Sequence, residues 1–395
     1  MPYDFDQLIE RRNTNSAKWR TYPEDVIPMW VADMDFASPE PVIRALRERN
    51  EHGVFGYELP SAELANAICE RIDRMYQWSI TPEHLVFLPG LVTGANVVCR
   101  AIGQPGDGVL MQTPAYPPFL SAPQNHGLTA NIAELTPTRN GRTIRYGIDF
   151  EAFEAAITPR THLFLLCNPQ NPAGCVYDHE QLTRLADICL RHDIVICSDE
   201  IHCDLLLGDT HHTPLASIAP EIAERCFPLM APSKTFNLPG LGCSFATVTD
   251  PDLRQRLNTA SAGIVPLLNV MGLAAALAAY RESDDWLAEL RRYLTANRDA
   301  LVNYVVEYLP DIYITVPQAT YLAWLDCREA GIEGSPYEFF LSKAKVALGD
   351  GAIFGPGGQG FVRLNFGCPR SRLMQALEQM RAALHPPARA TGDAL

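Results

Sequence analysis

The residue that most directly suggests chemistry is Lys234. It follows residues 227–230, an apolar run that predicts a buried strand, and it precedes a loop rich in glycine and proline at residues 238–242. An amine at the end of such a strand loses part of its water, which favours the neutral, nucleophilic form that condenses with a carbonyl to a Schiff base. An ordinary surface lysine at a strand end is the alternative, and for a lone motif it is the commoner situation.

A carboxylate, Asp199, stands at the end of a second apolar run, residues 195–198. An unpaired charge at this depth is costly, so the carboxylate needs a cationic partner. A protonated pyridine nitrogen would serve, and an acidic partner keeps such a ring an effective electron acceptor. The alternative is that Asp199 caps the next turn.

Two further strand ends are followed by loops that can hold a flat ring. Residues 168–174 contain two Asn-Pro steps and end in glycine. They form a stiff loop that can present the Asn171 amide at a set angle, and an Asn-Pro bond here can be cis. Tyr116 stands in a proline-rich turn after residues 108–112 and offers an aromatic face. A simple turn and simple packing are the respective alternatives.

Donors for a phosphate group occur in residues 88–96, a glycine-rich segment between a predicted strand and a helix expected at residues 96–102. Backbone N–H groups at a helix N-terminus bind anions; Leu91 and Val92 would supply such groups, and Thr93 adds a hydroxyl. Alone, a glycine-rich turn is weak support. Together, the four features call for one ligand with a carbonyl carbon, a pyridine nitrogen, a phosphate and a flat ring. Pyridoxal 5′-phosphate has all four.

These residues need a scaffold that brings strand ends together. Apolar, β-rich runs alternate with helical patterns through the middle of the chain, which predicts an α/β fold with a mostly parallel central sheet and crossover helices. One crossover helix is expected at residues 178–192. The expected strands are residues 84–88, 108–112, 162–167, 194–198, 227–231 and 244–248. Ligand sites in such sheets lie beyond the carboxyl ends of the strands, which is where the residues above are placed.

After residue 282 the pattern changes to that of a smaller α+β domain. A long amphipathic helix at residues 284–308 precedes short strands near residues 312–315, 321–324 and 361–366. We expect four parts: an N-terminal segment that contributes to the small domain (1–45), a large cofactor-binding domain (46–282), the small C-terminal domain (283–385) and a flexible tail (386–395).

Composition and charge argue against several other functions. The 46 acidic residues against 32 basic ones give a net charge of −14, which disfavours a nucleic-acid or anionic membrane surface. Residues 264–280 are apolar but include a proline, and they predict a buried, alanine-rich helix rather than a membrane span. The 11 cysteines form no CxxC pairs and indicate reduced thiols and no metal site. Since the first residues lack a secretory signal, we expect a cytoplasmic protein.

Over nearly its full length the chain resembles the fold-type I pyridoxal-phosphate enzymes, the aspartate aminotransferase superfamily. The matching motifs are Asn171-Pro172-Ala173-Gly174, Ser198-Asp199-Glu200-Ile201-His202 and Ser233-Lys234, in the superfamily's order. The resemblance implies the fold of these transferases, with Lys234 as the catalytic Schiff-base lysine and Asp199 as the partner of the pyridine nitrogen. It also implies that Asn171 bonds the ring 3′-oxygen and that Tyr116 stacks on the ring. His202 falls near a position that often carries a tyrosine to the same oxygen.

Other implied roles concern the substrate and a second subunit. Arg363 matches the arginine that binds the substrate α-carboxylate, a task that suits a planar guanidinium. Trp30, Asn171 and Tyr116 are also expected to contact the amino-acid substrate. Tyr57 resembles the tyrosine that reaches the cofactor phosphate from the partner subunit, which implies a homodimer with active sites at the subunit interface.

Residues 28–36, Pro-Met-Trp-Val-Ala-Asp-Met-Asp-Phe, resemble the hallmark of one branch, the MalY/PatB-type carbon–sulfur β-lyases, which include cystalysin. The resemblance implies β-elimination from L-cystathionine or a related L-cysteine S-conjugate to thiol, pyruvate and ammonia. The loop after Lys234 lacks the phosphate-binding arginine of many aminotransferases, which this branch tolerates. Ala231 stands where a serine is frequent, and the hydroxyls of Ser233 and Thr93 would compensate. The alternatives are an aminotransferase and a regulatory protein that keeps the fold but acts through protein contacts.

Overall fold

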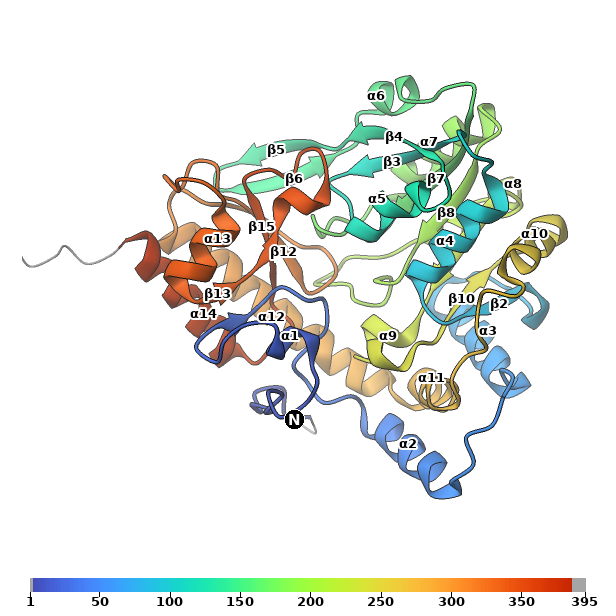
Figure 1. Ribbon diagram of the computed structural model, residues 1–395, viewed down its shortest axis with the longest axis horizontal. Helices are drawn as coiled ribbons and strands as arrows, with labels where there is room; N and C mark the ends of the chain where they lie inside the picture. The colour runs from blue at the N-terminus through green and yellow to red at the C-terminus, as the bar shows by residue number, and fades with distance from the viewer. Residues whose placement is uncertain (1–2, 386–395) are drawn as a thin grey trace, which may run out of the picture.

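The computed structural model describes residues 3–385 and contains two large β-sheets side by side (Figure 1). The first has seven strands in the order β2-β10-β9-β8-β7-β3-β4. Its strands are β2 (Leu85–Leu88), β3 (Gly108–Thr113), β4 (Thr129–Glu134), β7 (Thr161–Cys167), β8 (Val195–Asp199), β9 (Cys226–Met230) and β10 (Ser244–Thr247). Strand β10 is antiparallel to both neighbours, and all other pairs in this sheet are parallel. The predicted mostly parallel central sheet is confirmed.

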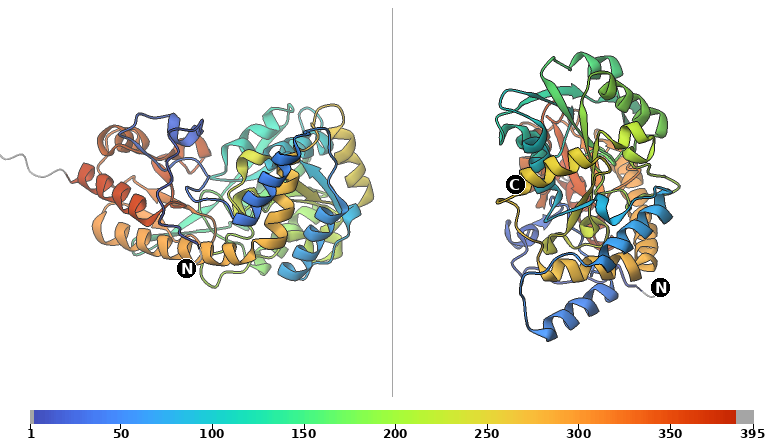
Figure 2. Two further views of the ribbon diagram at one scale, coloured as in Figure 1. Left: turned by 90° about the horizontal axis from the view of Figure 1, so that it is seen from below. Right: turned by 90° about the vertical axis from the view of Figure 1, so that its right-hand side faces the viewer.

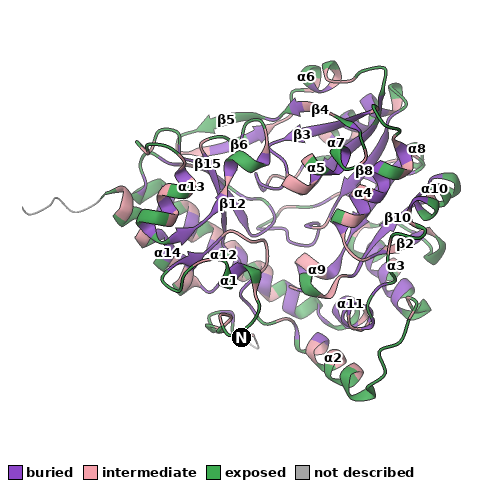
Figure 3. Cartoon of the chain, viewed as in Figure 1, coloured by how far each residue is buried: buried purple, intermediate pink, exposed green. Residues whose placement is uncertain are grey.

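Helices cover both faces of this sheet because its inner strands are apolar on both sides. In β8, Val195 and Cys197 share a core with α4 (Leu91–Ile102) and α10 (Pro251–Ser261). Ile196, which points the other way, shares a core with residues of α3 (Ala62–Tyr76), α7 (His179–Arg191) and α11 (Val270–Glu282). Figure 3 shows the strands buried between these layers. The carboxyl ends of the parallel strands are thereby aligned at one edge of the sheet, the place where ligands bind in such folds.

The second sheet has six strands in the order β14-β15-β12-β11-β6-β5. They are β5 (Thr136–Asn140), β6 (Thr143–Gly147), β11 (Tyr313–Thr315), β12 (Leu322–Asp326), β14 (Gly349–Asp350) and β15 (Phe361–Asn365). The hairpin β5–β6 lies within the range expected for the large domain, yet β6 pairs in parallel with β11 and extends this sheet. Two long helices, α12 (Asp284–Tyr308) and α14 (Arg370–Leu384), pack against each other beside it (Figure 2).

The N-terminal segment joins the C-terminal part of the chain through a short parallel pair, β1 (Ile27–Pro28) with β13 (Val346–Ala347). The remaining helices are α1 (Ala17–Arg20), α2 (Glu40–His52), α5 (Pro117–Gln124), α6 (Phe150–Ala155), α8 (Pro220–Ala223), α9 (Pro232–Thr235) and α13 (Pro336–Phe339). The expected tail, residues 386–395, lies outside the described residues.

Several boundaries differ from the sequence-based expectation. Helix α12 has the predicted bounds, but α4 begins at Leu91 rather than at residue 96. The glycines of this segment suggested a loop, whereas Gly94 lies inside the helix, where a Cβ would be 3.1 Å from Leu229 and 3.2 Å from Leu88. Glycine is therefore needed there for close packing of the helix on the sheet. Strands β4, β5 and β6 were not predicted, and β5 is exposed along its whole length, so it lacks an apolar pattern.

Within residues 3–385, no helix is long and apolar enough to cross a membrane. All 11 cysteines are free thiols, and eight of them are buried.

A buried ion cluster anchors the N-terminal segment. Lys18 is only 1% exposed, and its Nζ lies 3.0 Å from one carboxylate oxygen of Asp35. The other carboxylate oxygen accepts from Arg11 at 2.7 Å and from the Trp19 indole at 2.9 Å. Burial raises the pKa of Asp35, but Lys18, Trp19 and Arg11 outweigh it and leave that pKa below its ordinary value.

Replacing Lys18 with methionine is expected to lower the free energy of unfolding by about 3 kcal/mol, because the buried carboxylate loses a cation while its desolvation remains. Urea unfolding measures the change. Arg47→Met is the matched control: it breaks an ion pair with Glu40 in which both side chains are more than 60% exposed, and little change is expected. Equal losses in the two variants would contradict the prediction.

Candidate active site

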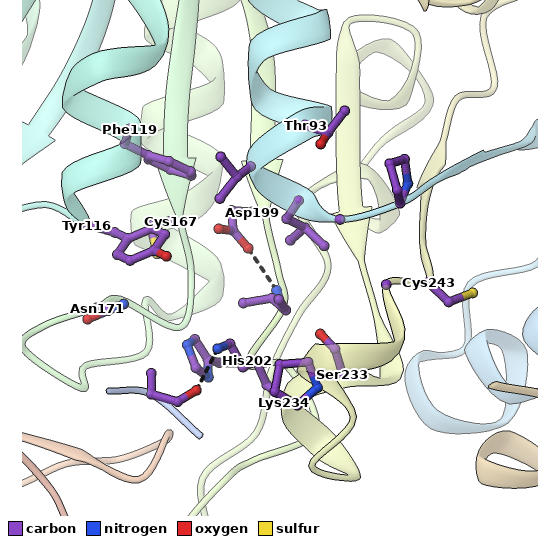
Figure 4. Close-up of a pocket in the computed structure, with 18 residues that line it drawn as sticks. Thr93, Tyr116, Phe119, Cys167, Asn171, Asp199, His202, Ser233, Lys234 and Cys243 are labelled. Atoms are coloured by element: carbon purple, nitrogen blue, oxygen red, sulfur yellow. Dashed lines mark hydrogen bonds between the residues drawn. The ribbon is translucent and has the colours of Figure 1, made fainter. Parts of the chain in front are cut away.

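A cavity of about 280 Å³ opens at the carboxyl edge of the seven-stranded sheet (Figure 4). Its walls come from the segments that follow β2, β3, β7, β8 and β9, five strands of one sheet. The predicted site residues that line it are Leu91, Val92, Thr93, Tyr116, Asn171, Asp199, His202, Ser233 and Lys234. The structure thus brings together nine side chains that the sequence spreads over more than a third of the chain.

Lys234 lies in the short helix α9, immediately after β9, with its amine partly buried. Nζ donates to the Ala32 carbonyl oxygen at 2.6 Å. Burial lowers the pKa of Lys234 to about 8, and the positive charge of Arg363 acts in the same direction. A substantial fraction of this amine is neutral near pH 7.5, which makes it both a nucleophile and a base.

Asp199 is the last residue of β8 and is buried. One carboxylate oxygen accepts the Ile201 backbone N–H at 3.0 Å, and within the described residues no side-chain cation lies within 4.0 Å of the carboxylate. Burial raises the pKa of Asp199 to about 7, partly offset by that hydrogen bond and by Lys234. Because a buried charge is costly unless it is paired, this carboxylate could bind a positively charged atom of a ligand.

The N-terminus of α4 at this cavity offers hydrogen-bond donors. Gly90 is the N-cap of α4, no side chain caps this helix, and the N–H groups of its first turn have no partner inside the helix. The Thr93 hydroxyl stands on the same cavity wall as this first turn, and the Ser233 hydroxyl stands on the facing wall. Ala231, by contrast, is not among the residues that line this cavity and lines a separate small cavity beside Arg71 and Tyr280.

The loops after β3 and β7 present Tyr116 and Asn171. The Asn168–Pro169 and Asn171–Pro172 peptide bonds are both cis, as expected for at least one of them. Gly174 closes the second loop at φ 71°, where a Cβ would be 2.9 Å from Pro317, so no larger residue fits.

His202 is buried beside Lys234 (Figure 4), edge-on to Tyr321. Its Nδ1 has no hydrogen-bond partner in the described structure. Burial and then the charge of Lys234 lower the pKa of His202 to about 3, so the imidazole is neutral. A neutral ring with a free nitrogen can serve a ligand oxygen as donor in one of its tautomers.

Arg363 and Trp30 adjoin the cavity without being among its lining residues. Arg363 is buried in β15; its Nη1 donates to Asn171 Oδ1 at 3.0 Å and its Nη2 to the Trp30 carbonyl at 2.8 Å. Its Nε has no partner, which leaves donor capacity for a ligand. Trp30 contributes this carbonyl, whereas its indole donates to the Lys18 carbonyl at 3.3 Å.

Tyr57 stands apart from the other site candidates. It is 96% exposed, in the extended segment between α2 and α3, and it does not line the cavity of its own chain. Its neighbours Val54, Phe55 and Leu59 are also exposed apolar side chains.

One family matches the chain over most of its length. The family described as aminotransferase class I and II matches residues 24–380. The chain belongs to this family.

Three members of this aminotransferase family illustrate the similarity. Cystathionine beta-lyase PatB of Bacillus subtilis is 38% identical over 96% of this chain and 100% of its own length. Protein MalY of Escherichia coli is 33% identical over 94% and 96% of the two chains. The solved structure of cystalysin from Treponema denticola, which contains pyridoxal 5′-phosphate, is 31% identical with a TM-score of 0.91, covering 97% of this chain and 99% of its own. The chain thus lies in the MalY/PatB branch of the aminotransferase family, as residues 28–36 predicted.

Sequence reasoning missed several parts of the cavity in this family member. Cys167 could have been found, because it ends β7 just as Asp199 ends β8. Gly242 and Cys243 belong to the loop after Lys234, which lacks the phosphate-binding arginine of many aminotransferases. Gly242 adopts φ 53°, and a Cβ there would be 3.1 Å from the Pro89 carbonyl oxygen. Ala32 lies within residues 28–36, which drew attention as a segment, but its side-chain type gave no signal because it contributes a backbone oxygen.

Proposed function

We propose that this chain is a pyridoxal-phosphate-dependent carbon–sulfur β-lyase that cleaves L-cystathionine or a related L-cysteine S-conjugate. The observation that carries the proposal is the meeting, in one cavity, of a partly neutral lysine amine, a buried carboxylate without a cation and a phosphate-sized cluster of N–H and O–H donors. The choice of a lyase within the family is supported by the similarity to PatB, which is named a cystathionine β-lyase.

The residues fit the cofactor group by group. Asp199 would pair with the protonated pyridine nitrogen, which removes the penalty of a lone buried carboxylate. The first turn of α4 at Leu91, Val92 and Thr93, together with Ser233, would bind the phosphate. Tyr116 would stack on the ring, and Asn171 and His202 would bond its 3′-oxygen. Lys234 would hold the carbonyl carbon.

The chain's own residues account for the elimination. Arg363 would take the substrate α-carboxylate through its free donor capacity, beside Asn171. When bound, the cofactor acts as an electron sink for the carbanion at the substrate α-carbon. Lys234, freed when the substrate amine takes its place, would remove the α-proton as general base. The electron pair of the former C–H bond would form the new double bond, the β-carbon–sulfur bond would break with its pair on sulfur, and the leaving sulfur would take up a proton to become the thiol. Hydrolysis of the released aminoacrylate gives pyruvate and ammonia, with homocysteine as the thiol from cystathionine.

A substrate panel tests this function. Cystathionine, cystine, cysteine and alanine are each incubated with the loaded enzyme, with and without a keto acid. A lyase releases pyruvate and thiol from the sulfur substrates without the keto acid, and none from alanine. Turnover that needs the keto acid would instead identify an aminotransferase. No turnover and no visible absorption of bound cofactor would favour a non-catalytic role.

Capture of pyridoxal phosphate by the cofactor-free protein is expected to speed up as the pH rises toward 8 and to level off above it. Only the neutral amine attacks the carbonyl, and burial lowers the pKa of Lys234 to about 8. Timed borohydride reduction followed by mass analysis of the Lys234 peptide measures the rate. A rate that keeps rising to the pKa of an ordinary lysine, 10.5, would contradict the assignment.

We further propose a homodimer in which Tyr57 enters the partner's active site. The Tyr57 side chain is so exposed that it cannot stabilise its own subunit by packing. The exposed apolar side chains on the same segment suit a subunit interface. The proposed location is the cytoplasm, since thiols as numerous as these stay reduced in such a compartment.

Mixing two inactive variants tests the placement of Tyr57. Tyr57→Ala and Lys234→Ala are co-expressed. About half of the dimers are then hybrids, and one of the two sites in each hybrid has both residues, so the mixture is expected to regain about a quarter of the parent activity. If Tyr57 served its own subunit, every site would keep one defect and the mixture would stay as inactive as its components. Pyruvate release from cystathionine is the readout.

A further inference from the structure

Residues 30–36, called the strap below, pass beside the cavity without forming a helix or a strand. Buried backbone of this kind must find hydrogen-bond partners outside regular secondary structure. Arg11 and Lys18 of the N-terminal segment supply two of the partners of the strap's carbonyl oxygens, and the others are side chains from distant parts of the chain. Arg363 donates to the Trp30 carbonyl, and Asn365 donates to the Val31 and Asp33 carbonyls. Lys234 and Tyr321 both donate to the Ala32 carbonyl. Asn237 donates to the Met34 and Phe36 carbonyls.

The Ala32 carbonyl is the contact between the strap and the reacting amine (Figure 4). It accepts from Lys234 Nζ at 2.6 Å and from the Tyr321 hydroxyl at 2.9 Å. No other hydrogen bond of the Lys234 amine occurs within residues 3–385. A hydrogen bond from a charged donor is stronger than a neutral one, so the position of this carbonyl governs where the free amine points.

Asn237 ties the strap to the segment that carries Lys234. It adopts φ 57°, a conformation that asparagine and glycine tolerate better than other residues. Its Oδ1 accepts the Met34 N–H at 3.0 Å, and its Nδ2 donates to the Met34 carbonyl at 3.0 Å and to the Phe36 carbonyl at 2.9 Å. One amide thus makes three bonds to the strap from only three positions beyond Lys234.

We propose that Asn237 is a positioning residue for the reacting amine: it locks the strap to the Lys234 segment and keeps the Ala32 carbonyl where the free amine donates to it. The inference rests on the proposed role of Lys234. Whenever the amine is not covalently attached, this carbonyl restricts its rotation and holds it facing the cavity. Asn365 secures the strap from the other side, on β15, two residues after Arg363.

The charged and titratable groups that act on the Lys234 amine are Asp33, Asp199, Arg363 and His202. None of them is substituted in the test variants, and Asp33 is itself part of the strap. A change in the titration of Lys234 would therefore report the position of the strap, through the Ala32 carbonyl and the Asp33 carboxylate.

The experiment titrates Lys234 in the full-length, cofactor-free chain. Brief acetylation at a series of pH values, with mass analysis of the Lys234 peptide, gives the pKa of the amine. Asn237→Gly keeps the backbone conformation accessible and removes all three bonds to the strap. It is expected to lower the pKa of Lys234 by about one pH unit, because the ammonium loses its carbonyl acceptor.

Tyr321→Phe gives an independent test with the opposite sign. It keeps the ring in place and removes the second donor to Ala32, so the carbonyl serves the amine alone, and the pKa of Lys234 is expected to rise by about half a pH unit. Ser38→Ala is the matched control: it removes the bond from Ser38 Oγ to the Asn237 carbonyl at 3.1 Å, just past the strap, and should leave the titration unchanged.

A folded Asn237→Gly protein whose Lys234 titrates as in the parent would overturn the proposal. If that variant does not fold, an unchanged titration in Tyr321→Phe would do the same. Circular dichroism shows which case applies. Because no substrate takes part, a failed lyase assay leaves this result standing, and a failed titration leaves the lyase proposal standing.

Discussion

Replacing Lys234 with alanine is expected to lower the rate of pyruvate formation from cystathionine by about 10⁴-fold, the upper end of the range for a lost general base. The variant loses both the nucleophile that holds the cofactor and the base that removes the α-proton. No other lining residue of the cavity can supply a neutral amine, since Lys234 is its sole lysine within the described residues. Stopped-flow and end-point pyruvate assays measure the loss.

Two controls separate chemistry from damage. Lys345→Ala removes a half-exposed lysine paired with Asp25 on the surface and should keep the parent rate. Cofactor content, measured after denaturation, must show that Lys234→Ala still binds pyridoxal phosphate non-covalently. Small primary amines added to the loaded variant should restore part of the rate, because they replace the missing base. Parent-like turnover with bound cofactor would rule out the proposed role.

The second large effect is expected at Asp199. Asp199→Asn should lower the same rate by about 10³-fold, because an amide cannot keep the pyridine nitrogen protonated and the ring then accepts electrons poorly. The substitution is nearly isosteric, and the new side-chain oxygen can still accept the Ile201 N–H. The effect should therefore fall on kcat more than on binding of the substrate.

The stability of the cofactor-free protein provides a second check, because Asp199→Asn lowers the rate but should not lower the stability. Burial raises the pKa of Asp199 to about 7, so folding favours its protonated form. In the cofactor-free parent, the stability linked to this group is full below the unfolded pKa of 3.8 and is lost as the pH rises toward 7. Asparagine has no such cost. The cofactor-free variant should be at least as stable as the parent at pH 8, by urea unfolding, even though it is nearly inactive.

Asp187→Asn, on the exposed side of α7, serves as the matched control and should change neither the rate nor the stability. A cofactor-free Asp199→Asn protein that is clearly less stable than the parent would show that Asp199 is a structural residue. A full rate in the loaded variant would exclude it as the partner of the ring nitrogen.

The sequence by itself determined the strand ends and the residue types that follow them. Lys234, Asp199, Tyr116, Asn171 and Thr93 each stand just after an apolar run, and parallel strands align their carboxyl ends at one edge of a sheet. Hydrophobic periodicity is local, so these positions could be predicted without any knowledge of packing. The same reasoning failed at α4, because Gly94 suggested a turn when its role is close contact with Leu229 and Leu88.

Only the tertiary structure decided how the amine is held. The bond from Lys234 to Ala32 joins residues 202 positions apart, and its acceptor is a backbone oxygen that every residue type possesses. The bond of Arg363 to Asn171 and the three bonds of Asn237 to the strap likewise join residues that lie far apart in the sequence. Such contacts depend on how two sheets and an irregular segment pack together. Side-chain chemistry at strand ends can therefore be inferred from sequence, whereas the backbone groups that orient it appear only when the chain is folded.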